Sequence, residues 1–179
     1  MKHSTASWGR ALFSFVARPF GPRHFCYTKE MQTKTDQSYG VLPIRWMEGE
    51  WQIFLIHQFS KIGNNSYWIF PKGHPEPNET PAETAKRELL EETGMSVSKL
   101  LNEPVFTLQY NFVFDGVRID KRVDFFLGII TDFEFKLQVE EVKEAGWYSL
   151  EEAGERLDYQ DTKTMFVEVK AFLRDFADQ

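Results

Sequence analysis

The chain has 179 residues, of which 42% are hydrophobic and 27% are charged, and its formal net charge is -6. This length suits one domain with a proper core. No apolar run approaches the roughly 20 residues that a membrane-spanning helix needs, so no membrane association is expected. Cys26 is the only cysteine, which excludes an intramolecular disulfide and a cysteine-based zinc site and favours a reducing compartment.

Charge is distributed unevenly along the chain. Residues 1–30 hold five Lys or Arg against one Glu and so carry +4, which leaves -10 for residues 31–179. An acidic body argues against nonspecific wrapping of nucleic acid, so no stable nucleic-acid partner is expected. Residues 1–37 show no helical or strand periodicity. They are interpreted as an N-terminal extension that is a transit peptide, a disordered arm or an upstream stretch ahead of a start at Met31.

The predicted domain therefore spans residues 38–179. It is expected in the cytoplasm, or in an organelle if residues 1–30 are a genuine transit peptide. Its first elements are aromatic and β-branched runs at residues 39–46 and 51–59, joined by a glycine-containing turn that favours a hairpin. A short strand follows and ends at Pro71, because proline cannot donate to a ladder.

The next element is a helix that the sequence marks at both ends. Thr80 is a suitable N-cap, Pro81 suits the first helical position, and Glu83 completes a capping box. Gly94 then supplies a stop.

Beyond this helix, strands and helices follow in separate runs. The sequence predicts a second hairpin around Asp115-Gly116, a short strand, and two closing helices, the second capped by Asp161. Their ranges are 104–114 with 118–131, 145–148, about 149–157, and 161 to about 176. Strands outnumber helices, so the predicted fold class is α+β, as an α/β/α sandwich.

Carboxylates crowd one side of the predicted mid-chain helix. At about 100° per residue, Glu88, Glu91 and Glu92 fall within one arc, which we expect to face solvent. The neighbouring arc is apolar and consists of Ala82, Ala85, Leu89 and Leu90. Crowded carboxylates need a cation, and oxygen ligands at i, i+3 and i+4 suit Mg²⁺ or Mn²⁺. The alternative is an ordinary solvated acidic helix.

The full spacing decides between these interpretations. Gly73 is followed at fixed intervals by Glu79, Arg87-Glu88-Leu89, Glu91-Glu92 and Gly94. This pattern resembles the Nudix box with every fixed position present. The resemblance implies a mixed curved sheet between helices and metal-dependent hydrolysis of a nucleoside diphosphate that is linked to another group.

The resemblance also implies roles for individual residues. Glu91, Glu92 and the carbonyl oxygen of Gly73 would bind the metal. Glu88 would be a further ligand or the base that takes a proton from water. Arg87 would orient a glutamate rather than contact the substrate.

Members of the family often use one more acid from a later loop, six residues before a tryptophan. Glu141 stands six residues before Trp147, so the resemblance implies that Glu141 is this metal ligand and catalytic residue. Glu140 is the competing choice, and an ordinary solvated loop glutamate is the alternative for both.

The flanks of the box indicate the substrate. Residues 68–74, WIFPKGH, resemble the WxFPKGH segment of asymmetric diadenosine tetraphosphate hydrolases. That resemblance implies that Lys72 and His74 contact the polyphosphate. The alternative for both is a solvent-facing loop position.

Similarity to this family continues along residues 38–176. It implies that Lys121 meets phosphates, that Phe125 lies near the base and that Tyr159 stacks on adenine. Phe125 departs from the polar aromatic of many relatives, so the base contacts stay open. Tyr159 has a packing role as its alternative, and Tyr110 is interpreted as a sheet residue.

The predicted function is therefore asymmetric cleavage of diadenosine tetraphosphate to ATP and AMP by a monomeric enzyme that uses Mg²⁺ or Mn²⁺. The partner is a dinucleoside polyphosphate or another nucleotide substrate. A triphosphorylated RNA 5′ end or a damaged nucleoside triphosphate is the alternative substrate. A noncatalytic nucleotide sensor is disfavoured, because such modules usually lose metal-binding glutamates and this chain has kept them.

Overall fold

The computed structural model of the chain describes residues 32–60, 64–138 and 140–177. The predicted extension lies outside the described residues up to residue 31. Residues 33–37 of that extension belong to the first strand, which begins at Thr33 and pairs with a later strand from Arg118 onward. The sheet thus starts five residues before the predicted domain start at residue 38.

Seven strands and three helices make up the described part of the chain. In chain order they are β1 (Thr33–Met47), β2 (Glu50–Phe59), β3 (Ser66–Ile69), β4 (Lys72–Gly73), α1 (Pro81–Thr93), β5 (Lys99–Phe114), β6 (Val117–Ile129), β7 (Val142–Ser149), α2 (Leu150–Arg156) and α3 (Gln160–Ala177). The sheet order is β3-β2-β1-β6-β5, with β4 also paired to β1 and β7 to β2. The β1–β6 pair is parallel and the others are antiparallel, so the sheet is mixed.

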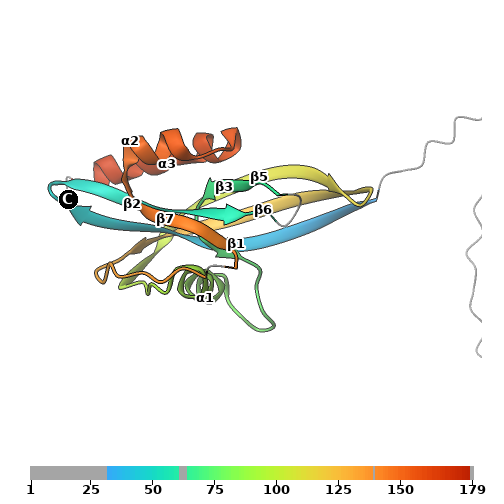
Figure 1. The fold of residues 1–179 in the computed structure, drawn as a ribbon, viewed down its shortest axis with the longest axis horizontal. Helices are drawn as coiled ribbons and strands as arrows, with labels where there is room; N and C mark the ends of the chain where they lie inside the picture. Colours follow the sequence, from blue (N-terminus) through green and yellow to red (C-terminus); the bar gives the residue numbers. More distant parts are fainter. Residues whose placement is uncertain (1–31, 61–63, 139, 178–179) are drawn as a thin grey trace, which may run out of the picture. The chain divides into compact units, whose positions relative to one another are not determined.

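Helices cover both faces of this sheet, as Figure 1 shows, with α1 on one side and α2 and α3 on the other. Successive strand residues point to opposite faces, so neighbours in β1 serve different cores. Val41 packs in the cluster that contains Ala85 and Leu89 of α1. Leu42 packs in the cluster that contains Val169 of α3. The predicted α/β/α sandwich is confirmed. None of the helices in the described residues is long and apolar enough to cross a membrane.

The local signals for α1 and the hairpins are also confirmed. Thr80 accepts a hydrogen bond from the backbone N–H of Glu83, whose side chain bonds back to the cap. Gly94 ends α1 with φ of 72°, a left-handed conformation that glycine adopts without Cβ strain. Glu48 and Gly49 form the β1–β2 turn with φ of 55° and 88°, the positive values that a tight hairpin turn requires.

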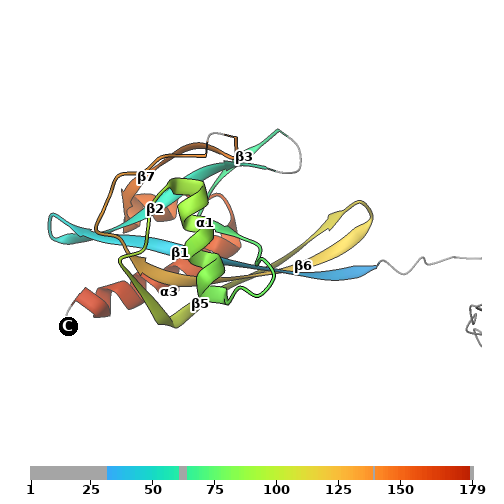
Figure 2. The ribbon, with the colours of Figure 1, turned by 90° about the horizontal axis from the view of Figure 1, so that it is seen from below.

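Two expectations about the helices were wrong, one about the N-cap of α3 and one about the side of α1 that faces solvent. The final helix α3 begins at Gln160, so Asp161 lies in its first turn rather than at its N-cap. The acidic arc of α1 does not face solvent throughout, because Glu92 is 3% exposed whereas the apolar Leu90 is 50% exposed. Figure 2 shows α1 lying across the face of the sheet. The side of α1 that contacts the sheet does not coincide with the predicted apolar arc. It includes Glu92, so a carboxylate lies in the contact between the helix and the sheet.

Candidate active site

The short strand β4 brings the box glycine against a box glutamate. Gly73 pairs with Tyr39 of β1, and a Cβ at Gly73 would overlap the carboxylate of Glu88. The side chain of Glu88 is 15% exposed. Only glycine leaves room for this carboxylate to lie directly on the strand, so the two positions depend on each other.

Glu92 lies one helical turn further along α1 and is buried against the same strand. One carboxylate oxygen accepts from the backbone N–H of Lys72 at 3.0 Å, and the other accepts from the side-chain amide of Gln58 at 2.7 Å. Burial raises the pKa of Glu92 to about 7; the charge of Glu88 also raises it, whereas Lys72 lowers it. The carboxylates of Glu88 and Glu92 are thus both largely shielded from solvent, and such a pair favours a bound cation.

Arg87 connects the acidic residues of the box. Its guanidinium donates to both oxygens of Glu79 at 2.7 and 3.0 Å, and to Glu88 and Glu91 at 2.9 Å each. It also donates to the carbonyl oxygen of His74 at 2.8 Å. The pKa of Glu79 is lowered to about 2, first by its hydrogen bonds from Arg87 and then by those from the backbone of Glu76 and the side chain of Thr84. Arg87 is thus placed to orient glutamates, with its donors turned to protein rather than to a ligand.

The donor set suits a hard divalent ion. Carboxylates of Glu88 and Glu92 and the carbonyl of Gly73 are oxygen donors of the kind that Mg²⁺ and Mn²⁺ accept. Glu91 is 52% exposed and turned toward Arg87. Within the described residues, no three His, Cys, Asp or Glu side chains are already arranged as a complete metal site.

The loop before β7, which contains Glu141, is attached to both β2 and α1. The backbone carbonyl of Glu141 accepts from Phe59 at the end of β2 at 2.8 Å. Gln138 in the same loop donates its backbone N–H to the carbonyl of Glu92 at 3.3 Å. These two attachments place Glu141, which is partly buried, near the strand that supplies Gln58, whereas Glu140 is exposed.

A second group of polar side chains, the Lys121 cluster, consists of Lys121, His74, Asp36 and Ser38. The ammonium of Lys121 donates to Asp36 Oδ2 at 2.8 Å and to Ser38 Oγ at 2.6 Å, and lies 3.1 Å from His74 Nε2. His74 Nε2 is also 2.8 Å from Asp36 Oδ1. The structure therefore brings together His74 and Lys121, two of the predicted phosphate contacts. The third, Lys72, directs its ammonium to the side-chain oxygen of Gln58 at 3.4 Å, beside Glu92.

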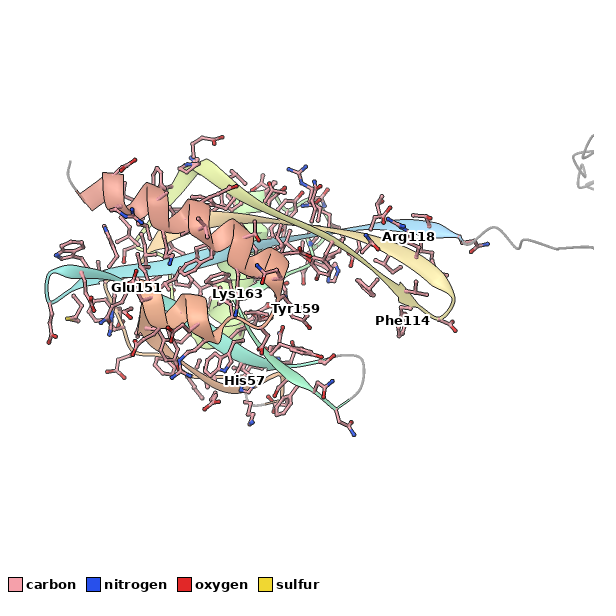
Figure 3. All side chains as sticks on the ribbon, turned by 90° about the horizontal axis from the view of Figure 1, so that it is seen from above. His57, Phe114, Arg118, Glu151, Tyr159 and Lys163 are labelled. Carbon is pink, nitrogen blue, oxygen red and sulfur yellow. The ribbon has the colours of Figure 1, made fainter. Side chains whose placement is uncertain are left out.

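The two predicted base contacts have different surroundings. Phe125 is 2% exposed and packs edge-on against Phe70, with ring centroids 5.7 Å apart. A side chain so deeply placed in the core has almost no surface to offer a nucleotide base. Tyr159 is 46% exposed, and its ring lies 4.8 Å from that of Tyr67. Figure 3 shows Tyr159 at the start of α3.

Tyr110 is the direct neighbour of Lys121 in the register of β5 and β6, and it packs against the core cluster that contains Val169 of α3. Burial raises the pKa of Tyr110, and the charge of Asp36 raises it further. The pKa of Tyr159 is also raised, first by burial, then by its hydrogen bond to Tyr67, with Tyr110 contributing.

Sequence reasoning did not single out Gln58, Asp36, Ser38 or Tyr67. Asp36 and Ser38 fall in or beside the stretch assigned to the extension, although they continue the period-two pattern of Gly40 and Leu42. That alternation was the available signal. Gln58 and Tyr67 contact their partners only through strand pairing, and no local motif marks them.

Comparison with known proteins defines the class. The NUDIX domain model matches residues 34–168. The asymmetrical bis(5′-nucleosyl)-tetraphosphatase of Rattus norvegicus is 32% identical over 135 residues, which cover 68% of this chain and 90% of the rat protein. The protein named as mutator MutT4 in Mycobacterium tuberculosis is 32% identical over 137 residues, covering 75% of this chain. The chain spans only 54% of the length of that relative.

Among solved structures, the Ap4A hydrolase of C. elegans in a binary complex superposes with a TM-score of 0.61 at 20% identity. The superposition covers 78% of this chain and 98% of the C. elegans chain, and it supports the fold alone. The chain therefore belongs to the NUDIX domain family, as an enzyme that acts on phosphoric anhydrides.

Proposed function

We propose that the enzyme hydrolyses diadenosine tetraphosphate asymmetrically to ATP and AMP, with Mg²⁺ or Mn²⁺ as its metal. The observation that carries this proposal is the arrangement around residues 72–74. Lys72 binds Glu92 through its backbone, Gly73 faces Glu88, and His74 lies in the Lys121 cluster. Three consecutive residues thus connect the acidic centre to the Lys121 cluster.

This arrangement suits an extended phosphate chain. If a divalent ion held by Glu88 and Glu92 bound one phosphate, we would expect the neighbouring phosphates to lie toward His74 and Lys121. His74 directly follows Gly73, which faces Glu88, and its Nε2 is 3.1 Å from the ammonium of Lys121. A mononucleotide would use only part of such a site. The exposed face of Tyr159 offers a surface on which adenine can stack. The similarity to the rat tetraphosphatase supports the same substrate.

The protein's own groups have distinct tasks in this hydrolysis. Arg87 holds Glu79, Glu88 and Glu91 in place, and a carboxylate of this cluster accepts the proton from the attacking water. When bound, a divalent ion would neutralise phosphate oxygens and make a water a better nucleophile. We expect Glu141, in the loop before β7, to contribute a further carboxylate to the metal site.

The experiment is product analysis with purified protein and diadenosine tetraphosphate in magnesium buffer, repeated after chelation. We expect ATP and AMP in equal amounts, with ¹⁸O from labelled water entering one of the two products. Two ADP molecules would refute asymmetric cleavage. Equal kcat/KM for diadenosine tetraphosphate and ordinary nucleoside triphosphates, or a preference for triphosphorylated RNA, would refute the substrate while leaving the acidic centre unaffected.

Two substitutions separate the site from general charge effects. Glu88→Gln should reduce kcat by at least about a hundredfold, because the carboxylate on Gly73 belongs to the metal centre. The matched control is Glu155→Gln, which changes an exposed glutamate of α2 and should leave kcat unchanged. Similar losses in the two variants would show that Glu88 acts only through overall charge.

A further inference from the structure

The ammonium of Lys121 already has an anionic partner within the chain. In the parallel register of β1 and β6, Asp36 is the direct neighbour of Lys121, although 85 residues separate them in sequence. Ser38 lies two residues further along β1 and so points to the same face of the sheet. The pairing of β1 with β6 therefore places the carboxylate of Asp36 beside the ammonium of Lys121.

Lys121 has little room for another partner. An ammonium has three hydrogen-bond donors. Asp36, Ser38 and His74 lie within 3.1 Å of Nζ, and the lysine side chain is 7% exposed. A phosphate oxygen that bonds to this ammonium therefore competes with these neighbours. Among these neighbours, Asp36 is the one that carries a negative charge, as a phosphate oxygen does.

Asp36 is also held in its charged form. Burial raises the pKa of Asp36, but the hydrogen bond and charge of Lys121, together with His74, outweigh burial and leave the pKa below its usual value. At neutral pH the carboxylate therefore compensates the charge of Lys121. An approaching phosphate meets a neutral pair rather than a free cation.

We propose that Asp36 is a specificity-determining residue that occupies the phosphate position beside Lys121 and must be displaced by the substrate. The inference rests on the proposed function for the identity of the substrate. A single phosphate has only this contact with which to displace Asp36. A polyphosphate that is already held at the acidic centre reaches Lys121 at a high effective concentration. Asp36 thus disfavours short phosphates and promotes release of products.

The test compares Asp36→Asn with wild type by isothermal titration calorimetry, using inorganic tripolyphosphate and inorganic phosphate in magnesium buffer. Loss of the competing charge should tighten tripolyphosphate binding about tenfold, a modest part of a unit-charge interaction at this range. Inorganic phosphate should also bind detectably tighter. Unchanged or weaker binding by Asp36→Asn would overturn the proposal, because it would make the carboxylate a support for Lys121 rather than a competitor.

Two further variants sharpen the result. Asp120→Asn removes an equivalent charge one residue from Lys121, where Asp120 pairs with Arg118 at 2.8 Å, and its binding of tripolyphosphate should match wild type. In a Lys121→Met background, Asp36→Asn should change binding by less than twofold. A tenfold gain in either case would point to general charge and overturn the proposal. Asp36→Ser, with no charge and a smaller side chain, should reproduce the gain seen with Asn.

Turnover provides an independent measurement. Asp36→Asn should lower KM for diadenosine tetraphosphate and strengthen inhibition by ATP, whereas the chemical step in single turnover stays within twofold. Since the titrations need no hydrolysis, tighter tripolyphosphate binding without cleavage of diadenosine tetraphosphate would refute the proposed substrate and uphold the role of Asp36. Normal cleavage without the affinity change would do the reverse.

Discussion

Glu92→Gln tests the acidic centre through stability as well as activity. Burial raises the pKa of Glu92 from 4.5 to about 7. Between these values the folded protein binds more protons than the unfolded chain, so the free energy of unfolding falls as pH rises. In metal-free protein this contribution is fully present below pH 4.5 and is lost as pH rises through 7. A shift of this size corresponds to about 3 kcal/mol.

The Gln variant resembles the protonated acid in shape and carries no charge. Wild type and Glu92→Gln should therefore have similar stability near pH 4.5. By pH 8, metal-free Glu92→Gln should be more stable than wild type by up to about 3 kcal/mol. Denaturant unfolding in chelator at several pH values between 5 and 8 measures this difference. Parallel curves for the two proteins over this range would refute the buried, ionisable state of Glu92.

Metal binding and activity should both favour wild type over Glu92→Gln, in contrast to the stability of the metal-free proteins. At pH 8, magnesium should raise the unfolding free energy of wild type and leave that of Glu92→Gln nearly unchanged, because the variant lacks one of the carboxylates that would hold the ion. Turnover of the variant should fall by several orders of magnitude. Activity within threefold of wild type would exclude Glu92 from the metal centre.

Three further predictions follow from particular residues. Gly73→Ala should displace Glu88 and reduce kcat by at least about tenfold, whereas Gly154→Ala, whose added Cβ meets Phe166 at an ordinary 3.6 Å, should leave kcat unchanged; equal kcat for both variants would contradict the close approach. Tyr159→Ala should weaken binding of diadenosine tetraphosphate by about 1–3 kcal/mol and raise KM, as expected for base stacking; a similar KM for Tyr159→Ala and Tyr159→Phe would exclude stacking. Deletion of residues 1–30 should preserve kcat and KM, since the family match begins at residue 34, and a truncated protein that loses activity or fails to fold would assign those residues to the domain.

Local sequence was sufficient for the elements whose ends are defined by neighbouring residues. Thr80 and Glu83 form the capping box of α1, and Gly94 ends the helix, as their spacing predicts. Asp115 and Gly116 form the β5–β6 turn with positive φ. These features depend on backbone conformations and hydrogen bonds a few residues apart, so the sequence alone contains their cause.

The exposure of α1 depended on the direction from which the sheet approaches it. Periodicity placed Glu88, Glu91 and Glu92 in one arc but did not show how that arc faces the sheet. In the folded domain Glu92 is buried on Lys72, whereas Leu90 is half exposed. The backbone N–H of Lys72 and the amide of Gln58 stabilise this carboxylate in a buried position, and neither contact is visible in the helical pattern of α1.

Contacts between distant segments were decided by tertiary structure alone. The box residues and their spacing identified Arg87 and Glu88, yet nothing near Lys121 in sequence indicates that Asp36 lies beside it. Their proximity follows from the parallel register of β1 and β6, which joins segments 85 residues apart. Such a register is set by burial of both faces of the sheet between α1 and α3, because a shift of one residue would turn every core side chain to the opposite face.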